Sequence, residues 1–96
     1  MALEKNLTAS VMRWLKTIPN SWWLKVHGSP MQMAGVPDII GCLDGHFVGI
    51  ELKVGSNQTS KIQKFMIAKI KTAGGSTVVA YSLKEVRTFI ERIQNA

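Results

Sequence analysis

The sequence predicts one α/β domain whose helices and strands follow the order αβββαβα. Three observations carry this prediction: hydrophobic residues recur at helical spacing in three segments, an Asp-Gly pair separates two strand-like runs, and Gly, Pro and polar residues cluster between the segments. The chain has 96 residues and 46% hydrophobic content, which suits one core and leaves little room for a second. We therefore expect residues 1–96 to form a single domain.

The first half of the chain predicts one helix and three strands. Residues 3–17 carry a helical stripe that Pro19 ends, and the aromatic and β-branched segment 21–27 predicts a strand. Residues 28–37 hold two Gly and two Pro among small residues, so they predict a loop. Two strands joined by Asp44-Gly45 follow. The stripe of the first helix consists of Leu3, Leu7, Val11, Trp14, Leu15 and Ile18.

The second half predicts a helix, a strand and a helix. After the polar loop 55–59, residues 60–73 form a helix that Gly74-Gly75 ends, and residues 76–81 form a short buried strand. Ser82-Leu83-Lys84-Glu85 is a capping box that opens the last helix. The side chains expected to face inward are Ile62, Phe65, Met66, Ile70 and Ala73 in the first of these helices, and Val86, Phe89, Ile90 and Ile93 in the second.

The Asp44-Gly45 pair sets the register of the central hairpin. An Asp-Gly pair between strands favours a two-residue type I′ turn, so residue 43 pairs with 46, 42 with 47 and 39 with 50. Asp38 then lies directly opposite Glu51, and Lys53 points to the same face because side chains alternate along a strand. That face also carries Ile40, Cys42, Phe47 and Gly49, whereas the other face carries Ile39, Leu43, Val48, Ile50 and Leu52, which can pack against a helix.

Two carboxylates in this position need a physical reason. Directly opposed side chains have Cβ atoms about 4.5–5.5 Å apart, and like charges there repel. A bound divalent cation removes the conflict, because hard oxygen ligands suit Mg²⁺ or Mn²⁺. Lys53 beside it could stabilise developing negative charge or help to deprotonate a water. The alternative is structural, with Asp38 as a polar residue at a strand start and Glu51 and Lys53 as a surface pair.

The charge balance suggests a polyanionic partner. Twelve Lys and Arg residues face six Asp and Glu residues, for a net charge of +6, and nucleic acid is the simplest partner for such a chain. No apolar run is long enough to span a membrane, and the first residues lack the apolar segment of a secretory signal. Cys42 has no second cysteine to pair with, which predicts a reducing, cytoplasmic location. It also has no Cys or His partner nearby for a metal ion, which argues against a zinc site.

At these residues the chain resembles the PD-(D/E)xK nucleases, through Pro37-Asp38 and, thirteen residues after Asp38, Glu51-Leu52-Lys53. Further motifs resemble the VRR-NUC branch of these nucleases more closely. The motifs are Lys25-Val26-His27-Gly28, Gly35-Val36-Pro37-Asp38, Ile50-Glu51-Leu52-Lys53, Ser60-x-x-Gln63 and Ala73-Gly74-Gly75. The resemblance covers about residues 3–90, and the combination is more specific than the loose PD…ExK pattern alone.

The resemblance implies a restriction-endonuclease-like core, with a mixed sheet flanked by helices, that hydrolyses DNA phosphodiester bonds with Mg²⁺ or Mn²⁺. Small members of this branch, typical of phages and bacteria, resemble homodimeric, structure-selective endonucleases akin to Holliday-junction resolvases. Matched residue by residue, Lys53 is the catalytic lysine and Gln63 is the helix glutamine that assists it. The metal ligands that the resemblance implies are Glu4, Asp38, Glu51 and the backbone carbonyl of Leu52.

Several residues also have a structural interpretation. Gln63 completes a capping box with Ser60, and Glu4 suits the positive end of the first helix dipole. Trp22 and Trp23 point to opposite faces, so one is expected in the core and the other could stack on a base or a second subunit. The residues considered for nucleic-acid contacts are Lys25, His27, Lys61, Lys64 and Lys71, with a solvated surface as the alternative, and the loop residues Met31, Gln32 and Met33.

The sequence thus favours a divalent-metal-dependent, structure-selective endodeoxyribonuclease that acts on branched or junction DNA as a homodimer. Symmetric cutting of a four-way junction needs two sites related by a two-fold axis, and a core this small gains from burying apolar surface against a second copy. Two alternatives remain open. One is a nuclease of flaps, other branches or single strands, and the other is a catalytically silent nucleic-acid-binding module on the same fold.

Overall fold

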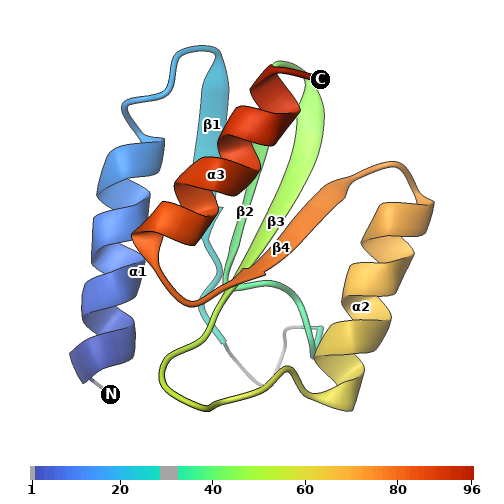
Figure 1. The fold of residues 1–96 in the computed structure, drawn as a ribbon. Helices are drawn as coiled ribbons and strands as arrows, with labels where there is room; N and C mark the ends of the chain where they lie inside the picture. The colour runs from blue at the N-terminus through green and yellow to red at the C-terminus, as the bar shows by residue number, and fades with distance from the viewer. Residues whose placement is uncertain (1, 29–32) are drawn as a thin grey trace.

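A computed structural model describes residues 2–28 and 33–96 of the chain. The order of its elements confirms the predicted αβββαβα arrangement, with ends that differ from the predicted ones by one or two residues (Figure 1). Met31 and Gln32, considered above for contacts, lie outside the described residues. No helix in the described part is long and apolar enough to cross a membrane. The elements are α1 (Ala2–Leu15), β1 (Ser21–Lys25), β2 (Ile39–Leu43), β3 (His46–Leu52), α2 (Lys61–Thr72), β4 (Ser76–Ala80) and α3 (Leu83–Gln94).

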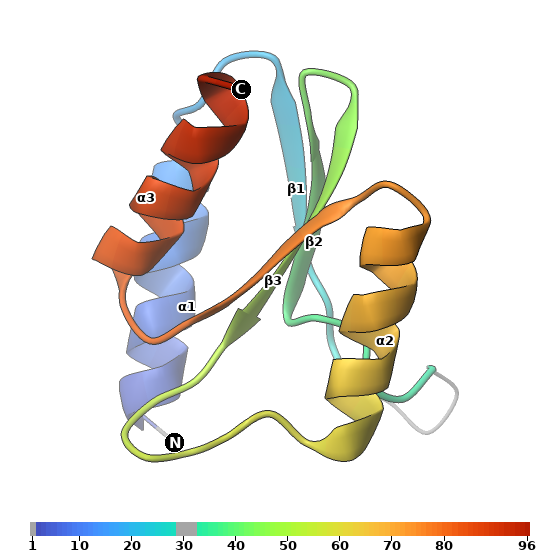
Figure 2. The same cartoon turned by 45° about the vertical axis from the view of Figure 1, so that its right-hand side comes forward.

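The described strands form one mixed sheet in the order β1-β2-β3-β4. β1 and β2 pair antiparallel, as do β2 and β3, whereas β3 and β4 pair parallel because α2 carries the chain back between them. α1 and α3 cover one face of the sheet and α2 lies on the other, as Figure 2 shows. The mixed sheet with helices on both faces confirms the fold class that the sequence predicted.

The hairpin between β2 and β3 has the predicted register. Asp44 and Gly45 both have positive φ, 52° and 80°, as a type I′ turn requires. The five residue pairs that follow the turn run without an inserted residue, up to Ile39 opposite Ile50. The start of β2 therefore lies beside the end of β3, and the side chains of the two strands alternate between the two faces as predicted.

The core lies between the sheet and the helices α1 and α3. Trp23 joins it and packs over Gly41, whereas Trp22 is 60% exposed on the opposite face, so one tryptophan is in the core as predicted. Phe89 and Ile93 are partly buried against the core. The buried members are Val11, Leu15, Trp23, Ile39, Leu43, Val48, Ile50, Leu52, Ala80, Val86 and Ile90.

The prediction that α2 buries an apolar face is wrong. None of the described residues of α2 is buried, and Ile62 and Phe65 are 46% and 57% exposed. Met66 and Ile70 are half-buried, and Ala73, the C-cap residue, is exposed. The reason is that α2 packs beside the edge strand β4, while the core forms on the other face of the sheet.

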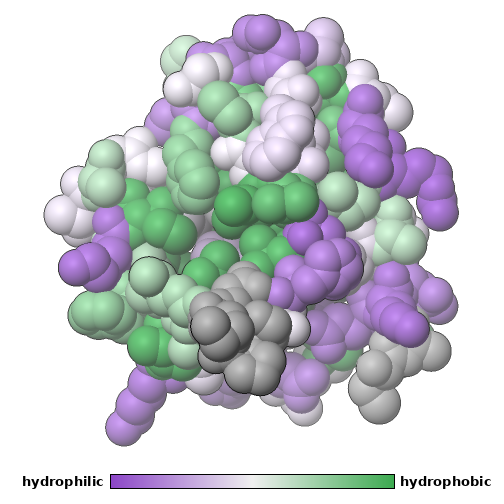
Figure 3. Space-filling model, turned by 180° about the vertical axis from the view of Figure 1, so that it is seen from behind, coloured by the Kyte–Doolittle hydropathy of each residue, from purple (hydrophilic) through white to green (hydrophobic). Residues whose placement is uncertain are grey.

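Among the described residues, the sheet face on the α2 side is therefore only partly covered. Alternation along β1 and β3 places three large apolar side chains on this face. Apolar side chains gather at the centre of this surface in the view from behind (Figure 3). We call this surface the open sheet face; its large exposed apolar side chains are Trp22, Leu24 and Phe47.

Gly41 provides a test of the packing on the core side. A Cβ on Gly41 would overlap the ring of Trp23 and the carbonyl oxygen of Trp22, whereas a Cβ on Gly28 would meet no atom within 4 Å. Overpacking of a core typically costs about 1–3 kcal/mol. We expect Gly41→Ala to lower the free energy of unfolding by about 2 kcal/mol in urea titrations. Gly28→Ala is the matched control and should leave it unchanged or slightly higher; equal values for the two variants would contradict the packing.

Candidate active site

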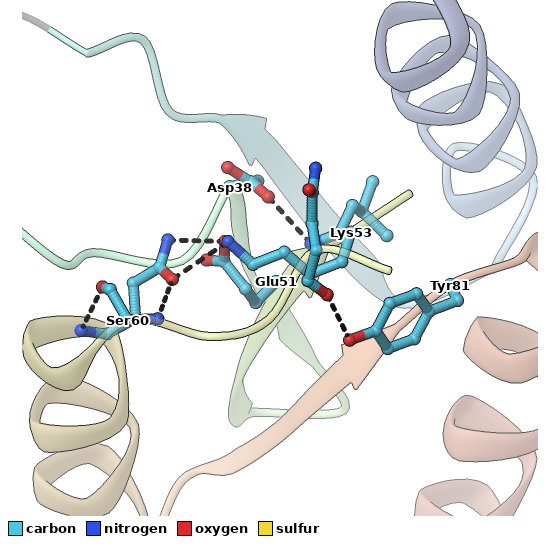
Figure 4. A network of polar contacts seen from close by, with 8 residues as sticks. Asp38, Glu51, Lys53, Ser60 and Tyr81 are labelled. Carbon is cyan, nitrogen blue, oxygen red and sulfur yellow. Dashed lines mark hydrogen bonds and ion pairs between the residues drawn. The ribbon is translucent and has the colours of Figure 1, made fainter. Parts of the chain in front are cut away.

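Four side chains that the sequence analysis singled out converge at one end of the sheet. Asp38 directly precedes β2, Glu51 lies near the end of β3, and Lys53 follows β3. Gln63 lies in the first turn of α2, whose start faces the same end of the sheet (Figures 2 and 4). The pairing of β2 with β3 brings the first three residues together, and α2 adds the fourth.

Asp38 is fixed by contacts to both neighbouring strands. Its Oδ2 accepts a hydrogen bond from the N–H of Leu52 at 2.8 Å, and its carbonyl oxygen accepts one from the N–H of Val26 at 2.8 Å. The carboxylate is thus held beside Glu51, and its negative charge contributes to the raised pKa of Glu51.

Glu51 is the buried carboxylate of the site. Its side chain is 2% exposed. Burial, followed by the charge of Asp38, raises the pKa of Glu51 from 4.5 to about 7, although Lys53 acts in the opposite direction. Glu51 Oε2 accepts a hydrogen bond from Gln63 Nε2 at 2.8 Å and lies 3.2 Å from Lys53 Nζ. Among the described residues Glu51 Oε1 has no hydrogen-bond partner, and this is costly for a buried carboxylate oxygen.

Gln63 joins the cap of α2 to this site. In the capping box, the hydroxyl of Ser60 accepts from the N–H of Gln63 at 3.2 Å, and Gln63 Oε1 accepts from the N–H of Ser60 at 2.9 Å. The same Oε1 accepts from Lys53 Nζ at 3.0 Å, while Nε2 donates to Glu51. The two interpretations of Gln63 are therefore compatible, because one side chain caps α2 and orients Lys53 and Glu51.

Lys53 presents a positive charge at the border of this network. Its N–H donates to the carbonyl oxygen of Ala80 at 3.0 Å, so its backbone still belongs to the sheet, and its side chain is 16% exposed. The ammonium group contacts Glu51 and Gln63 (Figure 4). Because an ammonium group has three N–H donors, one of them remains for a phosphate oxygen.

The sequence analysis missed a contact that holds the loop between Lys53 and α2. Tyr81, directly after β4, donates from its hydroxyl to the carbonyl oxygen of Asn57 at 2.7 Å (Figure 4). Its N–H donates to Glu85 Oε1 at 2.8 Å. The hydrogen bond to Asn57 fastens the loop that connects Lys53 to the start of α2, where Gln63 lies. No motif or periodicity links positions 57 and 81, and thus no sequence signal pointed to this pair.

Glu4 is separate from the acid pair. It is half-buried on α1 and lines a cleft that Asp38 also lines. Within residues 2–28 and 33–96, no three His, Cys, Asp or Glu side chains come close enough together to hold a metal ion. The three-acid ligand set implied by the motifs is therefore not assembled, because α1 packs on the core face whereas Glu51 points to the opposite face. The acids that meet are Asp38 and Glu51.

The residues considered for nucleic-acid contacts lie on two surfaces. Lys25 ends β1 and lines the same cleft as Glu4, and His27 is exposed in the loop after β1. Lys61, Lys64 and Lys71 are exposed on α2. These five residues are not among the partners in the hydrogen-bonded network around Glu51 that the structure describes.

Comparison with solved structures identifies the architecture. A chain described as "VRR_NUC domain" matches 93% of this chain and 95% of its own length, with a TM-score of 0.76 and 20% sequence identity. A "VRR_NUC domain protein" matches 94% of this chain and 86% of its own length, with a TM-score of 0.71 and 24% identity. The chain has the VRR_NUC fold. The fold that the motifs predicted is thereby confirmed.

Sequence comparison adds no further relative. No protein-family model matches the chain, and no curated protein matches it at a significant level. Because the sequence identity to the VRR_NUC structures is low, they establish the fold alone. The chemistry must be inferred from the residues that this chain places on the VRR_NUC fold.

The donor atoms at the end of this VRR_NUC sheet suit a divalent metal ion. Mg²⁺ and Mn²⁺ prefer carboxylate and carbonyl oxygens. Glu51 Oε1 is buried and has no partner among the described residues, and the hydrogen bond to Leu52 engages Asp38 through Oδ2. Binding of a cation would remove both the repulsion between the two acids and the cost of the unpartnered oxygen.

Proposed function

We propose that the chain is a divalent-metal-dependent endodeoxyribonuclease that acts on branched DNA. The observation that carries the proposal is the network at the end of β3. A buried carboxylate, one oxygen of which has no hydrogen-bond partner among the described residues, faces a second carboxylate, and a lysine held by a glutamine stands beside them. A structural role alone leaves the closeness of two acids unexplained, because like charges in contact destabilise a fold.

Asp38 and Glu51 would hold a Mg²⁺ or Mn²⁺ ion, with the Leu52 carbonyl and Glu4, which lines the same cleft as Asp38, as further oxygen donors. When bound, such an ion supplies a water of lowered pKa and neutralises charge on the scissile phosphate. The raised pKa of Glu51 means that the carboxylate must lose a proton before it can bind a cation at acid pH. Asp38 needs no rearrangement, because its hydrogen bond to Leu52 already orients it.

Lys53 would act directly on the phosphate, and Gln63 would hold Lys53 in position. The remaining N–H of Lys53 can donate to a phosphate oxygen, where negative charge grows during attack by water. Gln63 holds the ammonium group in place through Oε1 at 3.0 Å. A group that is already oriented needs no reorganisation during the reaction, which is the main source of its catalytic effect.

The roles of Gln63 can be separated by two substitutions. Ser60→Ala removes the hydroxyl partner of the capping box, and we expect a loss of about 1 kcal/mol in unfolding free energy with nearly normal cleavage. Gln63→Ala should cost similar stability and also slow cleavage by about 10- to 100-fold, as loss of supporting contacts at metal sites typically does. Urea unfolding and single-turnover cleavage of the same preparations measure both. If the two variants cleave DNA at equal rates, Gln63 only caps α2 and has no role in cleavage.

We further propose that the chain acts as a homodimer through the open sheet face. Its exposed Trp22, Leu24 and Phe47 lie on the same face of the sheet as Glu51, so a second copy seated there would place two active sites on one assembly. Trp22→Glu should convert a dimer into a monomer in light scattering at micromolar concentration, whereas Leu3→Glu, at another exposed apolar position, should not. A monomeric wild-type chain would exclude symmetric junction cutting.

The substrate is tested with a panel of end-labelled DNAs in the presence of Mn²⁺. The panel contains a four-way junction, a flap, a single strand and a linear duplex of the same sequences. Preferential and paired cuts in the junction support a resolvase-like activity, and preference for the flap or single strand selects the alternative nuclease. If the chain binds DNA tightly but cuts none of these substrates, it is the catalytically silent nucleic-acid-binding module. Asp38→Asn, purified identically, controls for contaminating nucleases.

A further inference from the structure

A cleft runs along α1 and ends at the candidate active site. α1 and β1 are neighbours at one edge of the molecule (Figure 1), and residues of both line the cleft. We call it the α1 cleft. Its lining residues are Glu4, Lys5, Asn6, Thr8, Ala9, Met12, Lys16, Lys25 and Asp38.

The walls of the α1 cleft come from one stripe of the helix. Residues 5, 9, 12 and 16 follow at spacings of four, three and four, so they share one side of the helix, while Val11 and Leu15 face the core. From Glu4 to Lys16 the stripe is roughly 18 Å long. One strand of DNA has a phosphate about every 3.4 Å along the helix axis, so the cleft has the length of roughly five nucleotides.

The charged residues of the α1 cleft are three lysines, one at the far end and two at the near end, where two acids also lie. Lys5, Lys16 and Lys25 are exposed, and the ion pair that the described residues form within 4 Å is Lys53 with Glu51, so these three ammonium groups are left for a ligand. The acids Glu4 and Asp38 lie together with Lys5 and Lys25 at the end nearest the active site, whereas Lys16 follows the far end of α1. Between these ends the wall is small and apolar at Ala9 and Met12.

We propose that the α1 cleft holds the sugar-phosphate backbone of the DNA strand that enters the active site, an inference that rests on the proposed nuclease function. Ammonium groups recognise phosphates without regard to sequence, and the apolar wall at Ala9 and Met12 suits the sugars between them. Because Asp38 lines the cleft, a strand bound there would end at this acid, which lies beside Glu51. The predicted contact residues on α2 define a competing path on the other side of the sheet, so the two paths can be tested against each other.

The test compares two double variants that remove equal charge. Lys16→Ala/Lys25→Ala removes two of the three lysines of the cleft, and Lys64→Ala/Lys71→Ala removes two exposed lysines of α2. Binding of a fluorescent four-way junction and of a duplex of unrelated sequence is measured by anisotropy in EDTA, between about 50 and 200 mM salt. For the cleft variant, we expect the slope of log Kd against log salt to fall by about 2, roughly one for each lost phosphate contact, with both DNAs weakened alike.

The outcomes separate this proposal from the proposed nuclease function. If the cleft variant binds DNA with the affinity and salt slope of the wild type, the proposal that the α1 cleft binds DNA is wrong, even if the chain cuts DNA. The proposal is also wrong if only the α2 variant loses affinity and salt slope. A chain that binds through the cleft but cuts nothing refutes the nuclease and leaves the cleft intact. Ala9→Glu, which adds a negative charge to the wall at an exposed position, should weaken binding in the same direction and checks the result without removing a lysine. If the wild-type chain shows no measurable DNA binding, the proposal that the α1 cleft holds a DNA strand is wrong as well.

Discussion

Lys53→Ala should slow the cleavage of branched DNA by about 100- to 1000-fold at saturating DNA, the effect typical of removing one preorganised group that stabilises transition-state charge. Its Nζ lies 3.2 Å from Glu51 Oε2 and 3.0 Å from Gln63 Oε1, so the charge is fixed at the site before DNA arrives. Because the contact to the phosphate strengthens as negative charge develops, the loss should appear mainly in kcat and much less in DNA affinity.

Three further variants make this result specific. Lys84→Ala removes the same charge from an exposed position on α3 and should cut normally. Lys53→Arg keeps the charge but not the geometry of a compact ammonium group, so we expect an intermediate rate. Asp38→Asn measures any contaminating nuclease. If Lys53→Ala cuts as fast as the wild type while Asp38→Asn is inactive, Lys53 has no part in catalysis.

The sequence was sufficient to predict the hairpin because the interactions that determine it are local. A two-residue turn with positive φ at both positions requires residues such as Asp and Gly, and the turn then fixes every pair up the two strands. The alternating apolar pattern selects the same register independently, since a slip by one residue would put the core side chains in water. The placement of Asp38 beside Glu51 follows from these two constraints, as does the partnership of Ser60 and Gln63, which are three residues apart.

The sequence was not sufficient where position depends on how whole elements pack. The apolar spacing of α2 correctly predicts a helix, but it does not say that the core will form on the other face of the sheet and leave Phe65 exposed. The same limit applies to Glu4, because nothing local determines how far α1 stands from β3. The contact of Tyr81 with Asn57 joins two segments 24 residues apart and depends on β4 lying parallel to β3.

Without a metal ion, the protein should lose stability as the pH rises from about 4.5 to about 7, because of Glu51. Burial and the charge of Asp38 raise the pKa of Glu51 from 4.5 in the unfolded chain to about 7 in the folded chain. Between these pH values the folded state binds a proton that the unfolded state has released, so a rise in pH favours unfolding. The shift corresponds to a loss of at most about 3 kcal/mol, complete above pH 7.

Comparison with Glu51→Gln isolates this contribution from the other titrating groups. Urea unfolding in EDTA at several pH values should give curves for the wild type and Glu51→Gln that converge at acid pH and separate as Glu51 ionises. Glu91→Gln, at an exposed position on α3, should follow the wild type. Addition of Mn²⁺ at neutral pH should restore stability to the wild type and not to Glu51→Gln, because a cation that binds the ionised carboxylate stabilises the folded state alone. If the unfolding free energies of the wild type and Glu51→Gln change in parallel across this pH range, burial beside Asp38 does not control the ionisation of Glu51. The inference that the two acids bind a cation would then lose its support.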